Sequence, residues 1–188
     1  DDVESRGLGD VYKRQNTGCG VGQASAGPFY CPTDKKIYLD ISFYKELTSK
    51  YKASGDFAMA YVIAHEVGHH VQNELGILGK YHRMQQGLSE KERNAISVRI
   101  ELQADYLAGV WARSIQDRNL LDVGDIEEAM NAAHAVGDDT LQKQAYGYSV
   151  PDSFTHGTSE QRMRWFKRGY EYGDLQHGDT FSLSDSEL

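Results

Sequence analysis

His65-Glu66-Val67-Gly68-His69 lies within a run from Phe57 to Leu75 whose pattern predicts a helix. Residues four apart lie one above the other on a helix, so His65 and His69 can direct two imidazole nitrogens at one metal ion. Glu66 lies about 100° around the helix axis from His65. Its carboxylate is therefore expected beside the metal, where it can take a proton from a metal-activated water. Two histidine ligands and a glutamate base are typical of zinc metallopeptidases.

Five-residue patterns of this kind also arise by chance in ordinary helices, so the surrounding sequence decides. On a helical wheel, the apolar residues of the run gather away from the two histidines, which predicts a buried face opposite a free ligand face. The predicted buried residues are Phe57, Ala60, Ile63, Ala64, Val67, Val71 and Leu75. We expect Asp56 to cap the start of the helix and Gly76 to end it in the left-handed conformation.

A second predicted helix offers a third ligand, which a catalytic zinc usually needs besides an open position for water. Ser89 and Glu92 form a capping box at its start, and it runs to about Gln116. Glu101 and Asp105 share one face; standing alone, they would be a solvated charged face. Beside the histidine pair, we interpret Glu101 as the third ligand and Asp105 as the acceptor for the free ring N–H of a ligand histidine. Small residues continue this face and would let the two helices approach closely. They are Ala108, Gly109 and Ala112.

Three stretches resemble the putative neutral zinc metallopeptidase family of bacteria, a group of zincins of the gluzincin type. They are Cys31–Asp40, Gly55–Gln72 and Glu101–Asp105, and the resemblance runs from about Cys19 to about Gly173. It implies an α+β, predominantly helical, zincin-like domain with a small β-hairpin beside the metal helix. It also implies one Zn²⁺ per chain and a peptide or protein substrate.

Length and charge restrict the class of protein. The chain has 188 residues, enough for one domain, and a net charge of −8. The sequence contains no basic patch with interleaved aromatics, which argues against nucleic acid as a partner. We see no signal peptide, and no apolar run reaches the roughly 18 residues that span a bilayer.

The two ends of the chain are expected to lie outside the domain. Residues 1–15 are polar and lack an initiator methionine, so we interpret them as a non-native or disordered leader. The domain is expected over residues 16–175, followed by an acidic, polar and frayed tail over residues 176–188. Relatives in the resembling family often carry a membrane segment upstream, which would anchor the natural protein.

The chain has two cysteines, Cys19 and Cys31, and three interpretations compete. They could contribute to a structural metal site, but such a site needs four ligands and no neighbouring cluster completes it. They could be separate buried thiols. They could instead form a disulfide that closes a small glycine-rich loop, which we favour. A disulfide predicts an oxidising compartment such as the bacterial periplasm or cell envelope.

The predicted β region covers residues 16–40. Its glycine-rich start, Thr17–Gly22, lacks the lysine and the following helix of a phosphate loop. Pro28–Cys31 and Lys36–Leu39 are predicted strands, joined by a turn at Pro32–Lys35. Zincins pair a strand edge beside the metal with extended substrate, and this hairpin is our candidate for that edge.

The remaining segments are expected to be helices and connectors. The predicted helices cover residues 40–53, 122–137, 138–146 and 158–172, with Asp40 or Ser42 capping the first and a Thr158–Gln161 capping box starting the last. Residues 77–88 are expected to form a connector. Non-catalytic positions are expected for His70, His82 and His134.

The segment from His156 to Arg162 resembles the His-Pro-x-x-x-x-Arg segment of some membrane-linked gluzincins, although Gly157 replaces the proline. The resemblance implies that His156 stabilises the oxyanion of the tetrahedral intermediate and that Arg162 supports it; alternatively, His156 is an ordinary loop histidine. Tyr146 and Tyr148 are rival candidates for the oxyanion role.

Two other functions remain open: a catalytically silent metal-binding or regulatory module, and a structural protein in which these residues only stabilise a helix pair.

Overall fold

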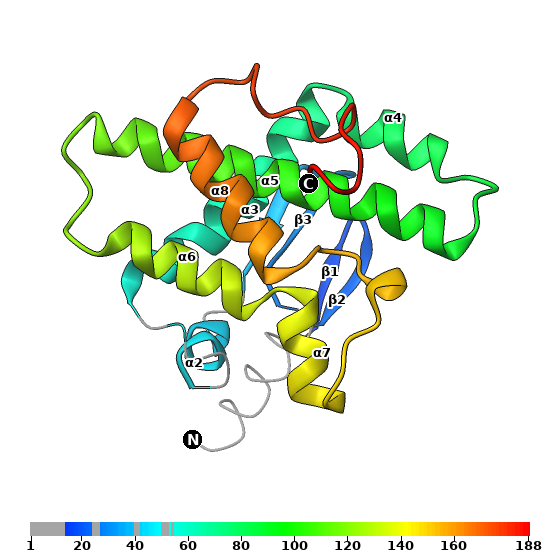
Figure 1. Ribbon diagram of the computed structural model, residues 1–188, viewed down its shortest axis with the longest axis horizontal. Helices are drawn as coiled ribbons and strands as arrows, with labels where there is room; N and C mark the ends of the chain where they lie inside the picture. Colours follow the sequence, from blue (N-terminus) through cyan, green and yellow to red (C-terminus); the bar gives the residue numbers. More distant parts are fainter. Residues whose placement is uncertain (1–13, 24–26, 40–41, 50–52, 54) are drawn as a thin grey trace.

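The computed structural model describes residues 14–23, 27–39, 42–49, 53 and 55–188. Within them the fold is α+β and predominantly helical, as predicted (Figure 1). The helices are α2 (Ser42–Ser49), α3 (Asp56–Glu74), α4 (Ile77–Met84), α5 (Glu90–Gln116), α6 (Asp125–Ala135), α7 (Asp138–Tyr146) and α8 (Ser159–Tyr172), with a 3₁₀ turn, η2 (Pro151–Ser153). The strands are β1 (Arg14–Thr17), β2 (Gly20–Gln23), β3 (Phe29–Cys31) and β4 (Lys36–Tyr38).

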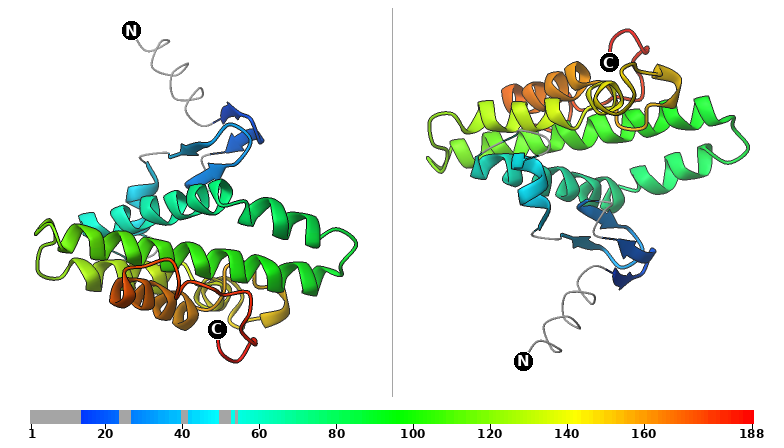
Figure 2. Two further views of the ribbon diagram at one scale, coloured as in Figure 1. Left: turned by 90° about the horizontal axis from the view of Figure 1, so that it is seen from above. Right: turned by 90° about the horizontal axis from the view of Figure 1, so that it is seen from below.

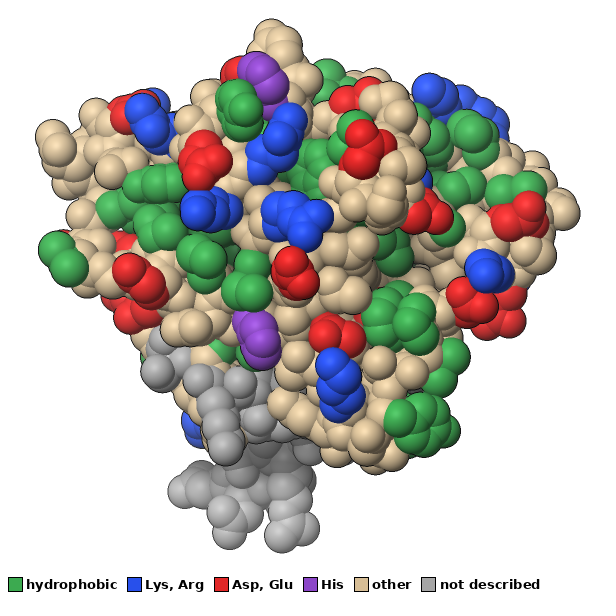
Figure 3. All heavy atoms as spheres, in the orientation of Figure 1, with side chains coloured by type: hydrophobic (Ala, Val, Ile, Leu, Met, Phe, Trp, Pro, Cys, Tyr) green, Lys and Arg blue, Asp and Glu red, His purple; other side chains and the backbone are tan. Residues whose placement is uncertain are grey.

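The elements lie in layers around α5, the longest of the described helices. Figure 2 shows α3 and α4 between the β-hairpins and α5, with α8 on the opposite side of α5. α6 packs against both α3 and α8, and the main apolar core lies among these helices. On the face seen in Figure 3, acidic and basic side chains are interspersed. The described residues contain no helix long and apolar enough to cross a membrane.

The buried face of α3 agrees with the predicted one only in part: Phe57 and Ala64 are buried as predicted. Ile63, Val67 and Leu75, which the helical wheel placed in the core, are 37%, 41% and 58% exposed. The face that carries His65 and Gln72 is buried instead. Its polar groups have hydrogen-bonding partners on α5 and α8, so this face can pack inward without leaving a polar group unpaired. The ligand face is therefore the packed face of the helix.

Glycines allow close helix crossings on both sides of α5. A Cβ atom on Gly68 of α3 would lie 2.9 Å from the carbonyl oxygen of Ala104 on α5. A Cβ on Gly109 would overlap the carbonyl oxygen of Phe166 on α8, and one on Gly169 would overlap that of Tyr106. The small residues of α5 that were predicted to contact α3 therefore face two helices. Ala108 and Ala112 join the core with α3, whereas Gly109 contacts α8.

Several helix ends were predicted correctly, and others were not: the helix expected over residues 122–137 is α6, Asp125–Ala135. The capping boxes at Ser89 and Thr158 are present, and Gly76 is left-handed with φ 74°. Asp56 does not cap α3; Gly55 holds that position, and the backbone N–H of Phe57 donates to Glu128 of α6 at 3.1 Å. Residues 77–84, predicted as a connector, form α4.

For α2, the expected span extended from residue 40 to residue 53. The described helix covers Ser42–Ser49, and the other candidate cap, Asp40, lies outside the described residues.

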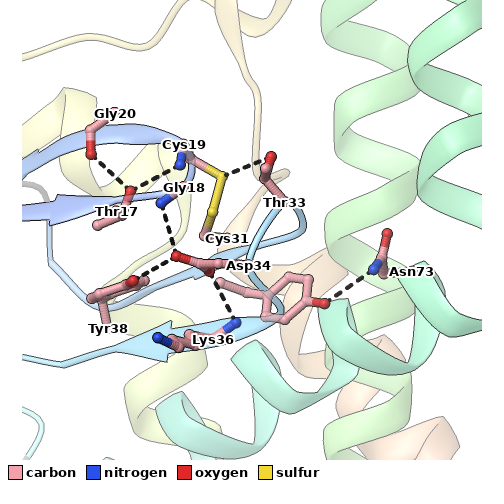
Figure 4. The surroundings of a disulfide bond; sticks show 11 residues. Thr17, Gly18, Cys19, Gly20, Cys31, Thr33, Asp34, Lys36, Tyr38 and Asn73 are labelled. Atoms are coloured by element: carbon pink, nitrogen blue, oxygen red, sulfur yellow. Dashed lines mark hydrogen bonds between the residues drawn. A yellow bond between two sulfur atoms is a disulfide. The ribbon is translucent and has the colours of Figure 1, made fainter.

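The two hairpins are joined covalently and fixed to α3. A disulfide links Cys19, in the turn between β1 and β2, to Cys31 at the end of β3, as favoured from sequence (Figure 4). The Tyr30 hydroxyl accepts a hydrogen bond from Asn73 Nδ2 at 3.1 Å and lies 3.0 Å from Nδ1 of His70, both on α3. β1 begins at Arg14, so the last two residues of the predicted leader belong to a strand.

The tail, expected to be frayed, packs against the helices. Thr180 and Leu188 are buried. Trp165 Nε1 donates to the carbonyl oxygen of Leu188 at 3.2 Å, and the rings of Tyr81 and Phe181 stack at 3.6 Å. Its polar composition did not reveal these few apolar anchors.

Candidate metal centre

The three predicted ligands, His65, His69 and Glu101, converge where α3 crosses α5. Nε2 of His65 lies 3.0 Å from Oε2 of Glu101, and Nε2 of His69 lies 3.4 Å from Oε1 of the same carboxylate. Their ligand atoms all lie within 4.8 Å of one another. Successive turns of α3 thus place two imidazole nitrogens, and α5 places one carboxylate, where they could bind the same metal ion.

The outer ring nitrogens of both histidines are already hydrogen-bonded. Nδ1 of His65 lies 2.8 Å from Oδ1 of Asp105, the acceptor predicted for a ligand histidine. Nδ1 of His69 lies 2.9 Å from Oε1 of Gln72, whose amide group donates to the carbonyl oxygen of Ile100 at 2.8 Å. Such contacts fix the ring orientation and leave Nε2 free for a metal. Nitrogen and oxygen donors held in this way fit Zn²⁺.

Behind His65, a buried ion pair supports Asp105. Arg162 of α8 donates from Nε to Oδ2 at 2.8 Å and from Nη2 to Oδ1 at 3.0 Å, and the Tyr61 hydroxyl donates to Oδ1 at 2.6 Å. Burial opposes ionisation, but the Arg162 guanidinium and His65 lower the pKa of Asp105 to about 2. The family resemblance implied that Arg162 supports His156; its described contacts run instead to Asp105, to Nδ1 of His65 and to the carbonyl oxygen of Val136.

Glu66 lies beside the three candidate ligands and is 8% exposed. Burial raises the pKa of its carboxyl above the ordinary value, while the positive charges of His65 and His69 and a hydrogen bond from the Tyr30 backbone amide act in the opposite direction. A carboxylate whose proton affinity is raised in this way suits proton transfer near neutral pH. Tyr30 of β3 also lines the same pocket as Glu66.

A pocket of about 440 Å³ opens onto the site. It is lined by the candidate ligands and Glu66, by β3 and the residues before it, and by residues from α2, from the end of α6 and from α7. His156 also lines it, which brings this residue to the same cavity as Glu66.

The loop that carries His156 is organised by Asp138. Oδ2 of Asp138 accepts the backbone N–H groups of Thr155, His156 and Gly157 at 2.7, 2.6 and 3.2 Å. Nδ1 of the His156 ring lies 2.9 Å from the Thr155 hydroxyl and 3.4 Å from the other oxygen of Asp138. The start of α7 therefore fixes the backbone that carries His156, and Asp138 and Thr155 together contact one nitrogen of its ring.

Other candidate residues lie away from the reacting groups. Tyr146 and Tyr148 are 70% and 64% exposed and are not among the described residues that line the pocket. His70 contacts Tyr30, while His82 and His134 are exposed. Sequence reasoning missed Tyr61, Gln72 and Asp138. Gln72 had a local signal, because it follows His69 by three residues and so shares its helical face.

Comparison with known proteins agrees with this geometry. The chain is 58% identical over 168 residues to the uncharacterized protein YpfJ of Escherichia coli K12, which covers 89% of this chain and 58% of YpfJ. It is 44% identical over 180 residues to the uncharacterized protein Rv2575 of Mycobacterium tuberculosis, covering 90% of this chain and 60% of that protein. The chain thus spans less than two thirds of these relatives.

No solved structure matches the chain. The family described as putative neutral zinc metallopeptidase matches residues 10–181, which include every group of the site. The chain belongs to this putative neutral zinc metallopeptidase family.

Proposed function

We propose that the chain is a zinc-dependent peptidase that binds one Zn²⁺ through His65, His69 and Glu101. The observation that carries this proposal is the convergence of these three donors beside Glu66 in an open pocket. A zinc ion there would act as a Lewis acid and lower the pKa of a coordinated water toward about 7.

Glu66 is the general base in this proposal. Its carboxylate removes a proton from the attacking water as the hydroxyl oxygen bonds to the peptide carbonyl carbon. It then delivers that proton to the amide nitrogen as the C–N bond breaks, which releases one carboxylic acid and one amine. Because burial raises the pKa of Glu66, the group can hold the proton between these two steps.

His156 is the candidate stabiliser of the negative oxygen that forms on the carbonyl. Its ring lines the same pocket as Glu66, and Nδ1 contacts the Thr155 hydroxyl and Asp138, which leaves Nε2 to donate. Removal of one such donor typically lowers the rate by about 10²–10³. The candidate support for extended substrate is β3, whose residues Phe29 and Tyr30 line the pocket.

The Cys19–Cys31 disulfide supports an extracytoplasmic location, since disulfides persist in oxidising compartments. We propose the bacterial periplasm or cell envelope. The upstream anchor expected from the family resemblance remains a proposal of its own.

The test combines metal content with cleavage. The parent chain, a Glu66→Gln variant and a Glu171→Gln control at an exposed position of α8 would be analysed for zinc and incubated with casein. About one zinc per chain in all three, with cleavage by the parent and the control only, is the expected result. Zinc in all without cleavage would favour the metal-binding module. No zinc after reconstitution would refute the metal site itself.

A further inference from the structure

Beyond the reacting groups, the pocket wall is apolar. Four half-buried or buried side chains line it from separate elements: Phe43 on α2, Val62 on α3, Val136 after α6 and Leu141 on α7. Val62 lies one turn before Glu66 on α3, so this wall begins directly beside the general base.

Among the described lining residues, the titratable side chains belong to the candidate site, except Tyr30, whose hydroxyl contacts Asn73 and His70 of α3. Arg162, the one residue with a permanent positive charge among the lining residues that the structure describes, is bound to Asp105 through two hydrogen bonds. A charged substrate side chain against the apolar wall would therefore lose its hydration without gaining a partner. A large apolar side chain has no such hydration to lose, and its packing would bury the apolar surface of the wall.

Resting on the proposed peptidase function, we propose that this wall selects peptides with a large apolar residue, such as Leu, Met or Phe, next to the cleaved bond. That side chain packs against Val62, Val136 and Leu141. A pocket of about 440 Å³ has room for such a side chain together with the adjoining backbone. Since one methylene in an apolar pocket changes kcat/KM by roughly 10- to 200-fold, Leu should exceed Ala by at least roughly tenfold.

The first test maps cleavage sites in casein and measures binding separately. Peptides that differ at one position, with Ala, Leu, Phe, Asp or Lys, would be titrated onto the zinc-loaded Glu66→Gln chain, which binds without cutting. We expect cleavage beside large apolar residues and at least roughly tenfold tighter binding of the Leu and Phe peptides than of the Ala and charged ones. Equal binding of all five peptides would overturn the inference. Selective binding with no cleavage by the parent would overturn the peptidase proposal alone.

A charge in the wall provides the second test. Leu141→Lys should weaken binding of the Leu peptide by at least roughly tenfold and strengthen binding of the Asp peptide. Leu175→Lys, at a 57% exposed position outside the pocket, is the matched control and should bind as the parent does. If Leu141→Lys does not fold, Leu141→Ala is used instead. It enlarges the pocket at the wall and should favour the Phe peptide over the Leu peptide. Peptide preferences unchanged in whichever Leu141 variant folds would overturn the inference.

Discussion

Replacing Arg162 with leucine would leave a carboxylate inside the protein without its cation. Asp105 has no solvent exposure and receives two hydrogen bonds from this guanidinium. Breaking a buried pair by removing one partner costs about 3–5 kcal/mol, because the remaining charge keeps its desolvation penalty. Tyr61 and His65 still contact Asp105, so we expect the lower half of that range. For a domain of this size, the melting temperature should then fall by roughly 6–16 °C.

The measurement is thermal and urea unfolding of the metal-free and zinc-loaded protein. Arg164→Leu is the matched control on the same helix: its exposed pair with Glu160, at 3.1 Å, should contribute less than about 1 kcal/mol. Zinc affinity should also fall by about 10- to 100-fold in Arg162→Leu, since Asp105 orients His65. If Arg162→Leu and Arg164→Leu unfold at the same temperature, the buried pair does not hold the site together as we argue.

Other substitutions test the helix crossing, the disulfide and the loop before α8. Gly68→Ala places a methyl group 2.9 Å from the carbonyl oxygen of Ala104 and should cost about 1–3 kcal/mol in thermal unfolding; an unchanged melting temperature would contradict the crossing. Replacing Cys19 and Cys31 with serine should cost about 3 kcal/mol, and a reducing agent should destabilise the parent but not this variant. Burial opposes ionisation of Asp138, but hydrogen bonds and His156 lower its pKa below the ordinary 3.8. Its ionised form therefore stabilises the fold above pH 3.8, and this contribution is lost as the pH falls through the lowered value. The destabilisation of Asp138→Asn should thus shrink in acid, and an equal loss at neutral and strongly acidic pH would refute the assignment.

The sequence revealed the candidate ligands because their spacing is a local property. Two histidines four residues apart on one helix must share a face, whatever packs against them. Glu101 required a further step, because it lies on another helix and its spacing from the histidines says nothing about contact. It was assigned because a catalytic zinc usually needs a third protein ligand. The structure brings it to both histidines, and Asp105 one turn later reaches the outer nitrogen of His65.

The buried face of α3 could not be read from hydropathy. The helical wheel separated polar from apolar positions correctly, but it assigned the core to Ile63 and Val67. Polar groups pack inward only when each finds a partner, and those partners lie far along the chain. Arg162 is 57 residues from Asp105, and a single sequence contains no signal of that contact. Local hydropathy therefore fails at this helix because its inward-facing chemistry is completed by other helices.

α5 connects the two helix crossings to the metal centre. Gly68 brings α3 against α5, and Gly169 brings α8 against its other side, in both cases where an added Cβ would strike a backbone carbonyl. The polar chain from Arg162 through Asp105 to His65 crosses the same three helices. Hydrogen bonds of 2.8 Å tolerate little displacement, so the helix separations set by these glycines also set the orientation of the ligand ring. The three candidate metal ligands are thus positioned by rigid helix contacts rather than by loops, as precise metal geometry would require.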